Sequence, residues 1–133
     1  MKKIYLLIGT LALVACAGVK EPAQLDGQKV FFAFDSAEIS SEAKDNLLGQ
    51  SLYMKNHTDT KVLVEGNCDE RGSSEYNLAL GALRSGNAAH VLIKDGIEKD
   101  RIKTISYGKE KPSVLGSGEE VWKQNRNATS RVK

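Results

Sequence analysis

The sequence predicts an α/β protein, an α+β sandwich in the order β-α-β-α-β-(α)-β, whose helices pack on a mixed parallel and antiparallel sheet. The first observation is that short β-prone runs alternate with longer helical segments, which implies some parallel pairing of strands. The second is size, because 133 residues with 41% hydrophobic and 27% charged residues make one ordinary globular domain. Twelve glycines and only two prolines exclude collagen-like and proline-rich disordered architectures.

Residues 1–15 predict a lipoprotein signal peptide. Lys2 and Lys3 precede a mostly apolar run over residues 4–14, which is shorter than the roughly 20 residues of a membrane-spanning helix. The run ends in Leu-Val-Ala-Cys at residues 13–16, which resembles the bacterial lipobox, whose cysteine is lipidated and becomes the new N-terminus. Because Ala and not Asp occupies position 17, the resemblance implies the outer membrane. An ordinary secretion signal that contains a cysteine by chance is the alternative.

Charge and cysteine content narrow the function class further. Without Lys2 and Lys3 the chain keeps 17 basic and 17 acidic residues. A neutral domain lacks the basic surface of nucleic-acid-binding proteins, and it predicts no polybasic patch for anionic lipid. With Cys16 lipidated, Cys68 is a lone thiol that cannot form an internal disulfide. We expect Cys68 to be a buried or half-buried bystander.

Residues 16–29 predict the lipidated Cys16 followed by a short tether, because this segment has few large apolar residues and contains Pro22 and Gly27. Fully extended, the chain from Cys16 to Val30 spans about 46 Å. The domain proper is then expected over residues 30–133.

The first half of that domain predicts two strands around one helix. Residues 30–34 and 61–65 are compact β-prone runs, the second ended by Gly66. Between them, Ser40 and the acidic residue after Ser41 predict the start of a helix over residues 41–56. This helix is expected to line up Leu48 and Leu52, flanked by Leu47 and Met54.

The second half predicts a long helix and two further strands. Ser73 is a plausible N-cap for a helix that runs to about Asp95, with Gly96 at its C-terminal end. Its sheet-packing face is expected to carry the small or apolar residues spaced by four and three, which are Leu78, Ala82, Ser85, Ala89 and Leu92. A strand at 102–107, a helical turn at 119–124 and a weak final strand at 127–133 complete the order.

The segment around the second strand resembles the OmpA-like C-terminal domain, and within that group the peptidoglycan-associated lipoproteins. The resemblance rests on Val-Leu-Val-Glu-Gly-Asn-Cys-Asp-Glu-Arg-Gly-Ser-Ser-Glu-Tyr-Asn-Leu-Ala-Leu-Gly-Ala-Leu-Arg at residues 62–84. Three pieces match in order, namely Phe-Ala-Phe-Asp at 32–35, Ser-Tyr-Gly-Lys-Glu-Lys-Pro at 106–112, and Asn-Arg at 125–126. The sequence departs from the family pattern at Gly86, at Asn127 and at the polar residues of the last strand.

The candidate site combines the loop before the long helix with one face of that helix. Asn77, Leu80 and Arg84 share a face at spacings of three and four, rotated about 100° from the face of Leu78. Asp69 comes from the loop, and a carboxylate with a guanidinium suits a zwitterion. The resemblance implies that the ligand is meso-diaminopimelate in peptidoglycan stem peptides. It implies the site residues Asp35, Asp69, Arg71, Asn77, Leu80, Arg84 and Arg126.

Structural alternatives remain open for these residues. Asp69 and Arg84 could form a salt bridge that braces loop to helix. Asp35 could cap a turn, Arg71 could be a solvated loop charge, and Asn77 could be a hydrogen-bonding residue at the helix start. Leu80 could belong to the core.

The function that the resemblance implies is binding and tethering. An outer-membrane lipoprotein, with its domain in the periplasm, would hold the wall non-covalently in a Tol-Pal type envelope and cell-division system, with a periplasmic Tol protein (TolB-like) as partner. The sequence shows no carboxylate pair, nucleophile–base pair or metal-ligand spacing, which predicts no enzyme, metal or cofactor. A lipoprotein that binds only protein, or a periplasmic enzyme acting on peptidoglycan, is the alternative.

Overall fold

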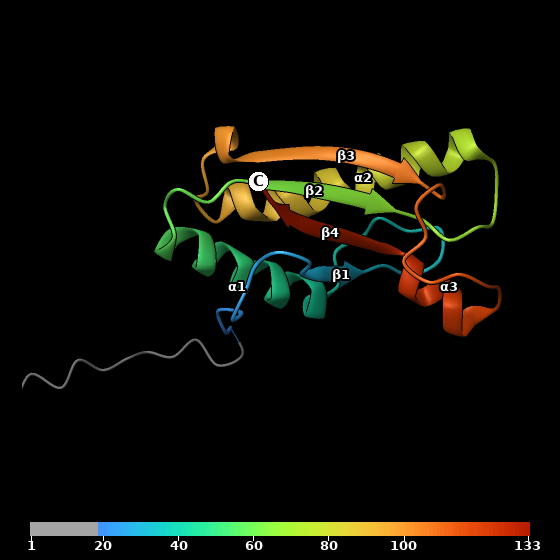
Figure 1. Ribbon diagram of the computed structural model, residues 1–133, viewed down its shortest axis with the longest axis horizontal. Coiled ribbons are helices and arrows are strands. Elements are labelled where there is room, and N and C mark those ends of the chain that lie inside the picture. Colours follow the sequence, from blue (N-terminus) through green and yellow to red (C-terminus); the bar gives the residue numbers. More distant parts are fainter. Residues whose placement is uncertain (1–18) are drawn as a thin grey trace, which may run out of the picture.

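The computed structural model describes residues 19–133 (Figure 1); the predicted signal peptide and Cys16 lie outside these residues. The elements are β1 (Lys29–Phe31), α1 (Ser41–Asn56), β2 (Val62–Asn67), α2 (Ser74–Lys94), the 3₁₀ turn η1 (Lys99–Arg101), β3 (Ile102–Gly108), α3 (Glu119–Asn125) and β4 (Asn127–Val132). The sheet order is β1-β4-β2-β3, with β2 and β3 parallel and the other two pairs antiparallel. The predicted fold class is confirmed.

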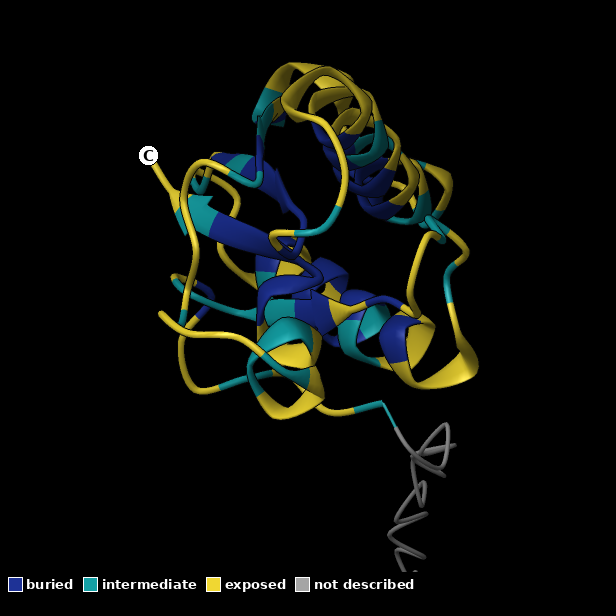
Figure 2. Cartoon of the chain, turned by 90° about the vertical axis from the view of Figure 1, so that its right-hand side faces the viewer, coloured by how far each residue is buried: buried dark blue, intermediate teal, exposed yellow. Residues whose placement is uncertain are grey.

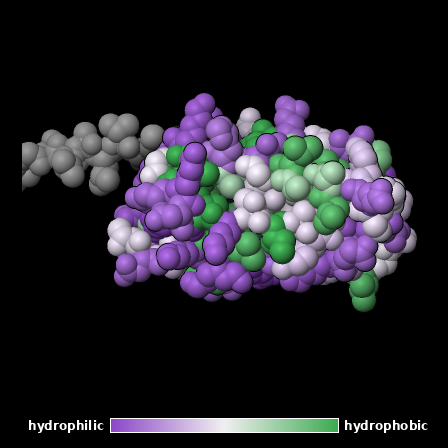
Figure 3. Space-filling view, turned by 90° about the horizontal axis from the view of Figure 1, so that it is seen from above, coloured by the Kyte–Doolittle hydropathy of each residue, from purple (hydrophilic) through white to green (hydrophobic). Residues whose placement is uncertain are grey.

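Both long helices pack on the same face of the sheet. Val62 and Val64 of β2 point toward the helices and join a core that includes Leu47 and Met54 of α1 and Leu92 of α2. Figure 2 shows the buried residues on the sides of the helices that are turned toward the strands, and exposed residues on the outer sides. Seen from above, over α2 and β3, apolar side chains are scattered among polar ones (Figure 3). None of the helices in residues 19–133 is long and apolar enough to cross a membrane.

Backbone lies directly on backbone where α2 crosses β2. A Cβ atom built on Gly66 would sit 1.8 Å from the carbonyl oxygen of Gly81, and one on Gly81 would sit 2.2 Å from Ser106 Oγ. The prediction that Gly66 ends the strand is therefore wrong, because β2 runs on to Asn67. Gly66 marks a close approach of helix and strand, which is the other structural use of glycine in a strand.

The buried faces of both helices differ in part from the predicted ones. In α2, Ser85, Ala89 and Leu92 are buried as predicted, but Leu78 is 52% exposed and Ala82 is exposed. In the first half of the helix the buried positions are Asn77, Gly81 and Arg84 instead. In α1, Leu47 and Met54 are fully buried whereas Leu52 is exposed. In the first half of α2, where the helix contacts β2 through glycine, Asn77 and Arg84 occupy the inner side in place of leucine.

The last strand is central and not weak. β4 pairs with β1 on one side and with β2 on the other. Its buried polar side chains are hydrogen-bonded: Ser130 donates to Gln50 Oε1 in α1, and Thr129 Oγ1 donates to Asn127 Oδ1 at 2.8 Å. These hydrogen bonds give the buried polar side chains of β4 the partners that an apolar environment would not supply.

The predicted first strand and the predicted tether also end at other residues than expected. β1 stops at Phe31, because the carbonyl of Ala33 turns toward Arg84 and leaves the ladder. Most of the described tether packs on the domain: Leu25 is buried and Gly27 N–H donates to Ser130 O at 2.7 Å.

The contact between Gly66 and Gly81 predicts the sign of two glycine substitutions. Gly66→Ala should lower the free energy of unfolding by about 3 kcal/mol or more, because the added methyl group meets rigid backbone. Gly86→Ala is the matched control, since a Cβ there meets nothing within 4 Å, and it should raise stability by about 1 kcal/mol. Urea denaturation measures both. Equal effects of the two variants would contradict the inferred contact.

Candidate functional site

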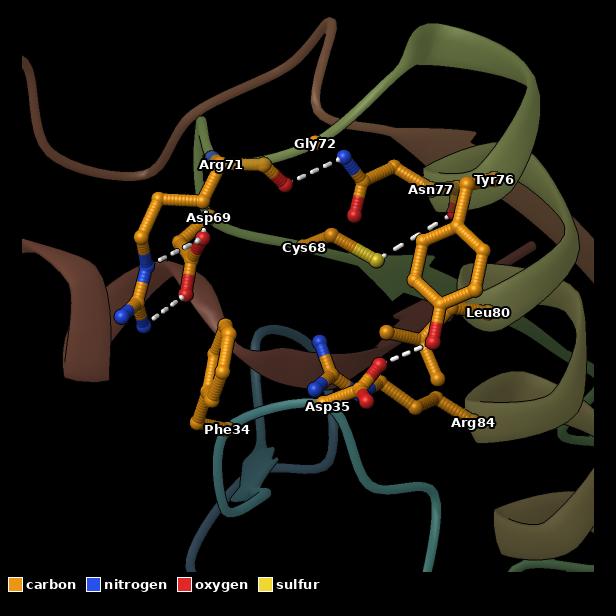
Figure 4. Close-up of a pocket in the computed structure, with 10 residues that line it drawn as sticks. All are labelled: Phe34, Asp35, Cys68, Asp69, Arg71, Gly72, Tyr76, Asn77, Leu80 and Arg84. Carbon is orange, nitrogen blue, oxygen red and sulfur yellow. Dashed lines mark hydrogen bonds and ion pairs between the residues drawn. The ribbon is translucent and has the colours of Figure 1, made fainter.

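A cavity of about 220 Å³ opens where β2 ends and α2 begins (Figure 4). Its walls come from the turn after β1, the loop after β2 and the first half of α2, and the first of these is far from the other two in the sequence. The lining residues are Phe34, Asp35, Cys68, Asp69, Arg71, Gly72, Tyr76, Asn77, Leu80 and Arg84. Six of the seven predicted site residues are among them, and Arg126 is the exception.

Arg84 brings a buried positive charge to the cavity. Its side chain is 1% exposed, and its three nitrogens donate to the carbonyl oxygens of Ser36 at 2.8 Å, Asn67 at 2.9 Å and Ala33 at 3.1 Å. Within residues 19–133 no carboxylate lies within ion-pair distance of Arg84. Burial lowers the pKa of Arg84, but a guanidinium stays protonated. The carbonyls orient the cation without neutralising it, which suits the binding of an anion.

Asp69 is paired with two other arginines. Its Oδ1 accepts from the backbone N–H and Nε of Arg71 at 3.0 and 3.2 Å, and its Oδ2 lies 2.8 Å from Arg71 Nη2 and 3.5 Å from Arg126 Nη1. Burial would raise the pKa of Asp69, but the hydrogen bonds from Arg71 outweigh it and hold the pKa below its usual value. The salt bridge between Asp69 and Arg84, considered from the sequence, is not formed.

Arg71 forms the rim of the cavity and is not a solvated loop charge. Its guanidinium lies 3.8 Å from the ring centre of Phe34 and 4.1 Å from that of Trp122. Stacked between two aromatic rings, it presents its edge to Asp69, a geometry that arginine favours and lysine cannot copy. An ammonium group that approaches Asp69 therefore shares the carboxylate with Arg71.

The remaining predicted residues complete the walls in different ways. Asp35 has a left-handed backbone (φ 53°) and accepts a hydrogen bond from the hydroxyl of Tyr76, which raises the pKa of that tyrosine. Asn77 is buried and donates to the carbonyls of Arg71 at 2.8 Å and Ser73 at 3.1 Å, so it holds the loop in place. Leu80 is half-buried and faces the cavity.

Arg126 does not line this cavity, but it is brought to one of the other predicted site residues, because its Nη1 lies 3.5 Å from Asp69 Oδ2. Its guanidinium is buried and donates to the carbonyl of Phe32 at 2.9 Å and to Glu119 at 2.8 Å. The bond from Arg126 holds the pKa of Glu119 below its usual value. Its contact with Asp69 makes Arg126 a support for a lining residue.

Sequence reasoning missed Phe34, Gly72 and Tyr76 as lining residues. Phe34 stands next to Asp35 in a motif that the resemblance already used, and Gly72 (φ 95°) precedes the helix cap, so both carried a usable signal. Nothing in the sequence singled out Trp122.

Cys68 is buried as expected; its thiol donates to the carbonyl of Asn77 at 3.2 Å, and burial raises its pKa. In residues 19–133 no cluster of His, Cys, Asp and Glu could hold a metal ion.

The lowered pKa of Asp69 predicts a dependence of stability on pH. Because the pKa is lower in the folded state, the stabilisation is present above the unfolded value of about 3.9 and is lost as pH falls through the folded value. Asp69→Asn should therefore cost about 1–3 kcal/mol at pH 7. The difference from the original protein should shrink below pH 4.

Urea denaturation from pH 3 to 7 measures this difference. Asp45→Asn is the control, because Asp45 is an exposed carboxylate of α1 and should change stability little at either pH. A constant gap between Asp69→Asn and the original protein over the whole range would contradict the inferred ion pairs.

Comparison with known proteins identifies relatives of the whole domain. The OmpA family pattern matches residues 31–126. A peptidoglycan-associated lipoprotein of Mesorhizobium japonicum is 36% identical over 148 aligned positions, covering 95% of this chain and 88% of the relative. One of Pasteurella multocida is 35% identical and covers 96% and 95%.

Solved structures of related proteins have the same fold as this chain. The peptidoglycan-associated lipoprotein from Burkholderia pseudomallei superposes with a TM-score of 0.77 at 39% identity, over 80% of this chain and 90% of that one. The C-terminal domain of Helicobacter pylori MotB gives a TM-score of 0.74 at 18% identity, over 80% and 84%, which shows the fold alone. The chain therefore belongs to the OmpA family and, within it, to the peptidoglycan-associated lipoproteins.

Proposed function

We propose that this chain is an outer-membrane lipoprotein that binds peptidoglycan non-covalently through the side chain of meso-diaminopimelate. Arg84 is the observation that carries this proposal, because a buried guanidinium without a carboxylate partner among the described residues stands ready for an anion from outside. A buried charge left unpaired is costly, and a bound carboxylate would remove that cost with a charge-assisted contact.

The end of a diaminopimelate side chain matches the polar groups of the cavity. It carries an ammonium and a carboxylate on the same carbon, so both groups enter together. The carboxylate would contact Arg84 and the ammonium would contact Asp69, and Asp35 is the second carboxylate that lines the cavity. Leu80 would cover the methylene chain.

The pKa shifts of Asp69 and Cys68 favour binding without catalysis. A glycosidase needs one carboxylic acid with a raised pKa, whereas ion pairs lower the pKa of Asp69. Cys68 has a raised pKa and donates its proton to a backbone carbonyl, so it is not a ready nucleophile. These features favour a binding module over an enzyme.

The tethering part of the proposal joins this domain to the membrane. The lipobox-like sequence would place a lipid on Cys16, and the domain would hold the wall from the periplasmic side of the outer membrane. The names of the relatives support this arrangement. A periplasmic protein of the Tol system (TolB-like) is the protein partner that we propose, in envelope maintenance and cell division.

The ligand assignment predicts a preference among short peptides. Peptides that carry lysine, or diaminopimelate with its side-chain carboxylate amidated, should bind about 10- to 100-fold more weakly than diaminopimelate itself. The reason is that each leaves Arg84 without its anion, and such a contact contributes about 1.5–3 kcal/mol. Calorimetry with the three peptides measures the preference in the unaltered protein, so folding of a variant is not at issue.

Two further results sharpen this experiment. Tyr76→Phe keeps Arg84 in place and should preserve the ranking of the three peptides. Arg84→Lys should reduce the differences in affinity among them, because an ammonium cannot replace the planar contact. Indistinguishable affinities of all three peptides for the unaltered protein would show that Arg84 does not recognise the carboxylate. The proposal would then fail.

Lipid attachment is tested separately from wall binding. Cys16→Ser should abolish the incorporation of labelled fatty acid and leave the precursor uncleaved, because the modified atom is the cysteine sulfur. Cys68→Ser is the control, since Cys68 is buried in the folded domain, and it should label like the original protein. Equal labelling of the Cys16 variant and the original protein would refute the lipoprotein assignment.

A further inference from the structure

The face of the sheet that points away from α1 and α2 carries a second polar cavity. Side chains alternate between the two faces of a strand, and Gly66 faces α2, so Glu65 and Asn67 point to the opposite side. The strand register places Lys29, Thr129 and Glu65 in one row across β1, β4 and β2. Together with Lys111 and Arg131, these residues line a cavity of about 260 Å³.

Positive charge exceeds negative charge in this cavity. Glu65 is 5% exposed, and it is already paired with Arg131 Nε at 3.2 Å and Lys111 Nζ at 3.6 Å. Lys29 Nζ donates only to hydroxyl groups, at 3.2 Å to Thr129 and 3.4 Å to Ser113, and within residues 19–133 it forms no ion pair. Three cations thus surround one carboxylate. Burial, and then the charge of Arg131, lower the pKa of Lys29.

A buried acceptor without a partner lies at the same cavity. Asn67 is 5% exposed, and its Nδ2 donates to Glu65 O at 3.3 Å and to Asn127 Oδ1 at 3.0 Å. Its Oδ1 has no hydrogen-bond partner. Such groups are uncommon in folded proteins because each costs free energy. The cavity therefore offers cations for an anion and one acceptor for a donor.

We propose that this cavity binds the carboxyl terminus of a peptide. The carboxylate would contact Lys29 and Lys111, and the adjacent amide N–H would donate to Asn67 Oδ1. In an N-acylated amino acid these two groups are attached to the same carbon, so one small ligand supplies both. An inorganic anion without a proton to donate would satisfy the lysines only. The proposal does not depend on the function of the Arg84 cavity, which lies on the other side of β2.

Three small probes separate the parts of this assignment. N-acetylalanine carries both the carboxylate and the N–H, its amide lacks the charge, and acetate lacks the N–H. NMR titration of the purified protein should show saturable shifts at the amides of Glu65, Asn67 and Thr129 with N-acetylalanine. The amide should bind about tenfold more weakly, and acetate several-fold more weakly, in line with the loss of one charged or one neutral hydrogen bond.

Surface variants test the residues without touching the core. The double variant Lys29→Gln/Lys111→Gln should bind N-acetylalanine at least about tenfold more weakly. Lys103→Gln is the matched control, because Lys103 is exposed on β3, points to the same face and does not line the cavity. It should bind within twofold of the original protein. Asn67 itself is avoided, since its carbonyl also holds Arg84.

Several results would overturn the proposal. These are shifts that do not saturate, equal affinity for the acid and its amide, an effect of Lys103→Gln as large as that of the double variant, or shifts confined to the residues around Arg84. The last result would leave the diaminopimelate assignment untouched, so the two proposals fail independently.

Discussion

The buried guanidinium of Arg84 is the contact on which the site depends. Its hydrogen bonds tie α2 to the end of β2 and to the turn between β1 and α1, three segments that no continuous strand or helix joins at this point. Backbone carbonyls are fixed partial charges, so they hold the guanidinium in one orientation and still leave its net charge. The same side chain thus shapes the cavity and supplies its positive potential.

The close contact of Gly66 with Gly81 sets the conditions for this arrangement. Because α2 lies on β2 without intervening side chains, the helix residue one turn beyond Gly81 reaches the far end of the strand. This residue is Arg84, and a helix held farther from the sheet by leucine would carry the guanidinium away from the carbonyl of Asn67. Polar burial in α2 is therefore a consequence of helix–strand distance. Of the residues that periodicity assigned to the inner face, Ser85, Ala89 and Leu92 are buried, whereas Leu78 and Ala82 in the first half of α2 are exposed.

The sequence predicted the fold class, the order of the elements and both helix caps, because those features depend on local signals. Ser40 and Ser73 accept hydrogen bonds from the N–H groups of Ala43 and Tyr76, as capping residues do. What the sequence could not show was the rotation of α2 and the central place of β4, because both depend on contacts between distant segments. Arg126 illustrates the same limit for the site: the motif named it, but only the packing of α3 places it behind Asp69.

Total charge proved a poor guide to local charge. Without Lys2 and Lys3 the chain is neutral by count, from which the sequence suggested that it has no basic patch. Lys29, Lys111 and Arg131 nevertheless line one cavity together with Glu65, and they come from three separate segments. Strand register brings them together, and register is invisible to composition. Asn67 lies between the two cavities: its carbonyl accepts from Arg84 on one side of β2, and its amide borders the lysine cavity on the other. One residue of a central strand thus contributes its backbone carbonyl to one cavity and its side chain to the other.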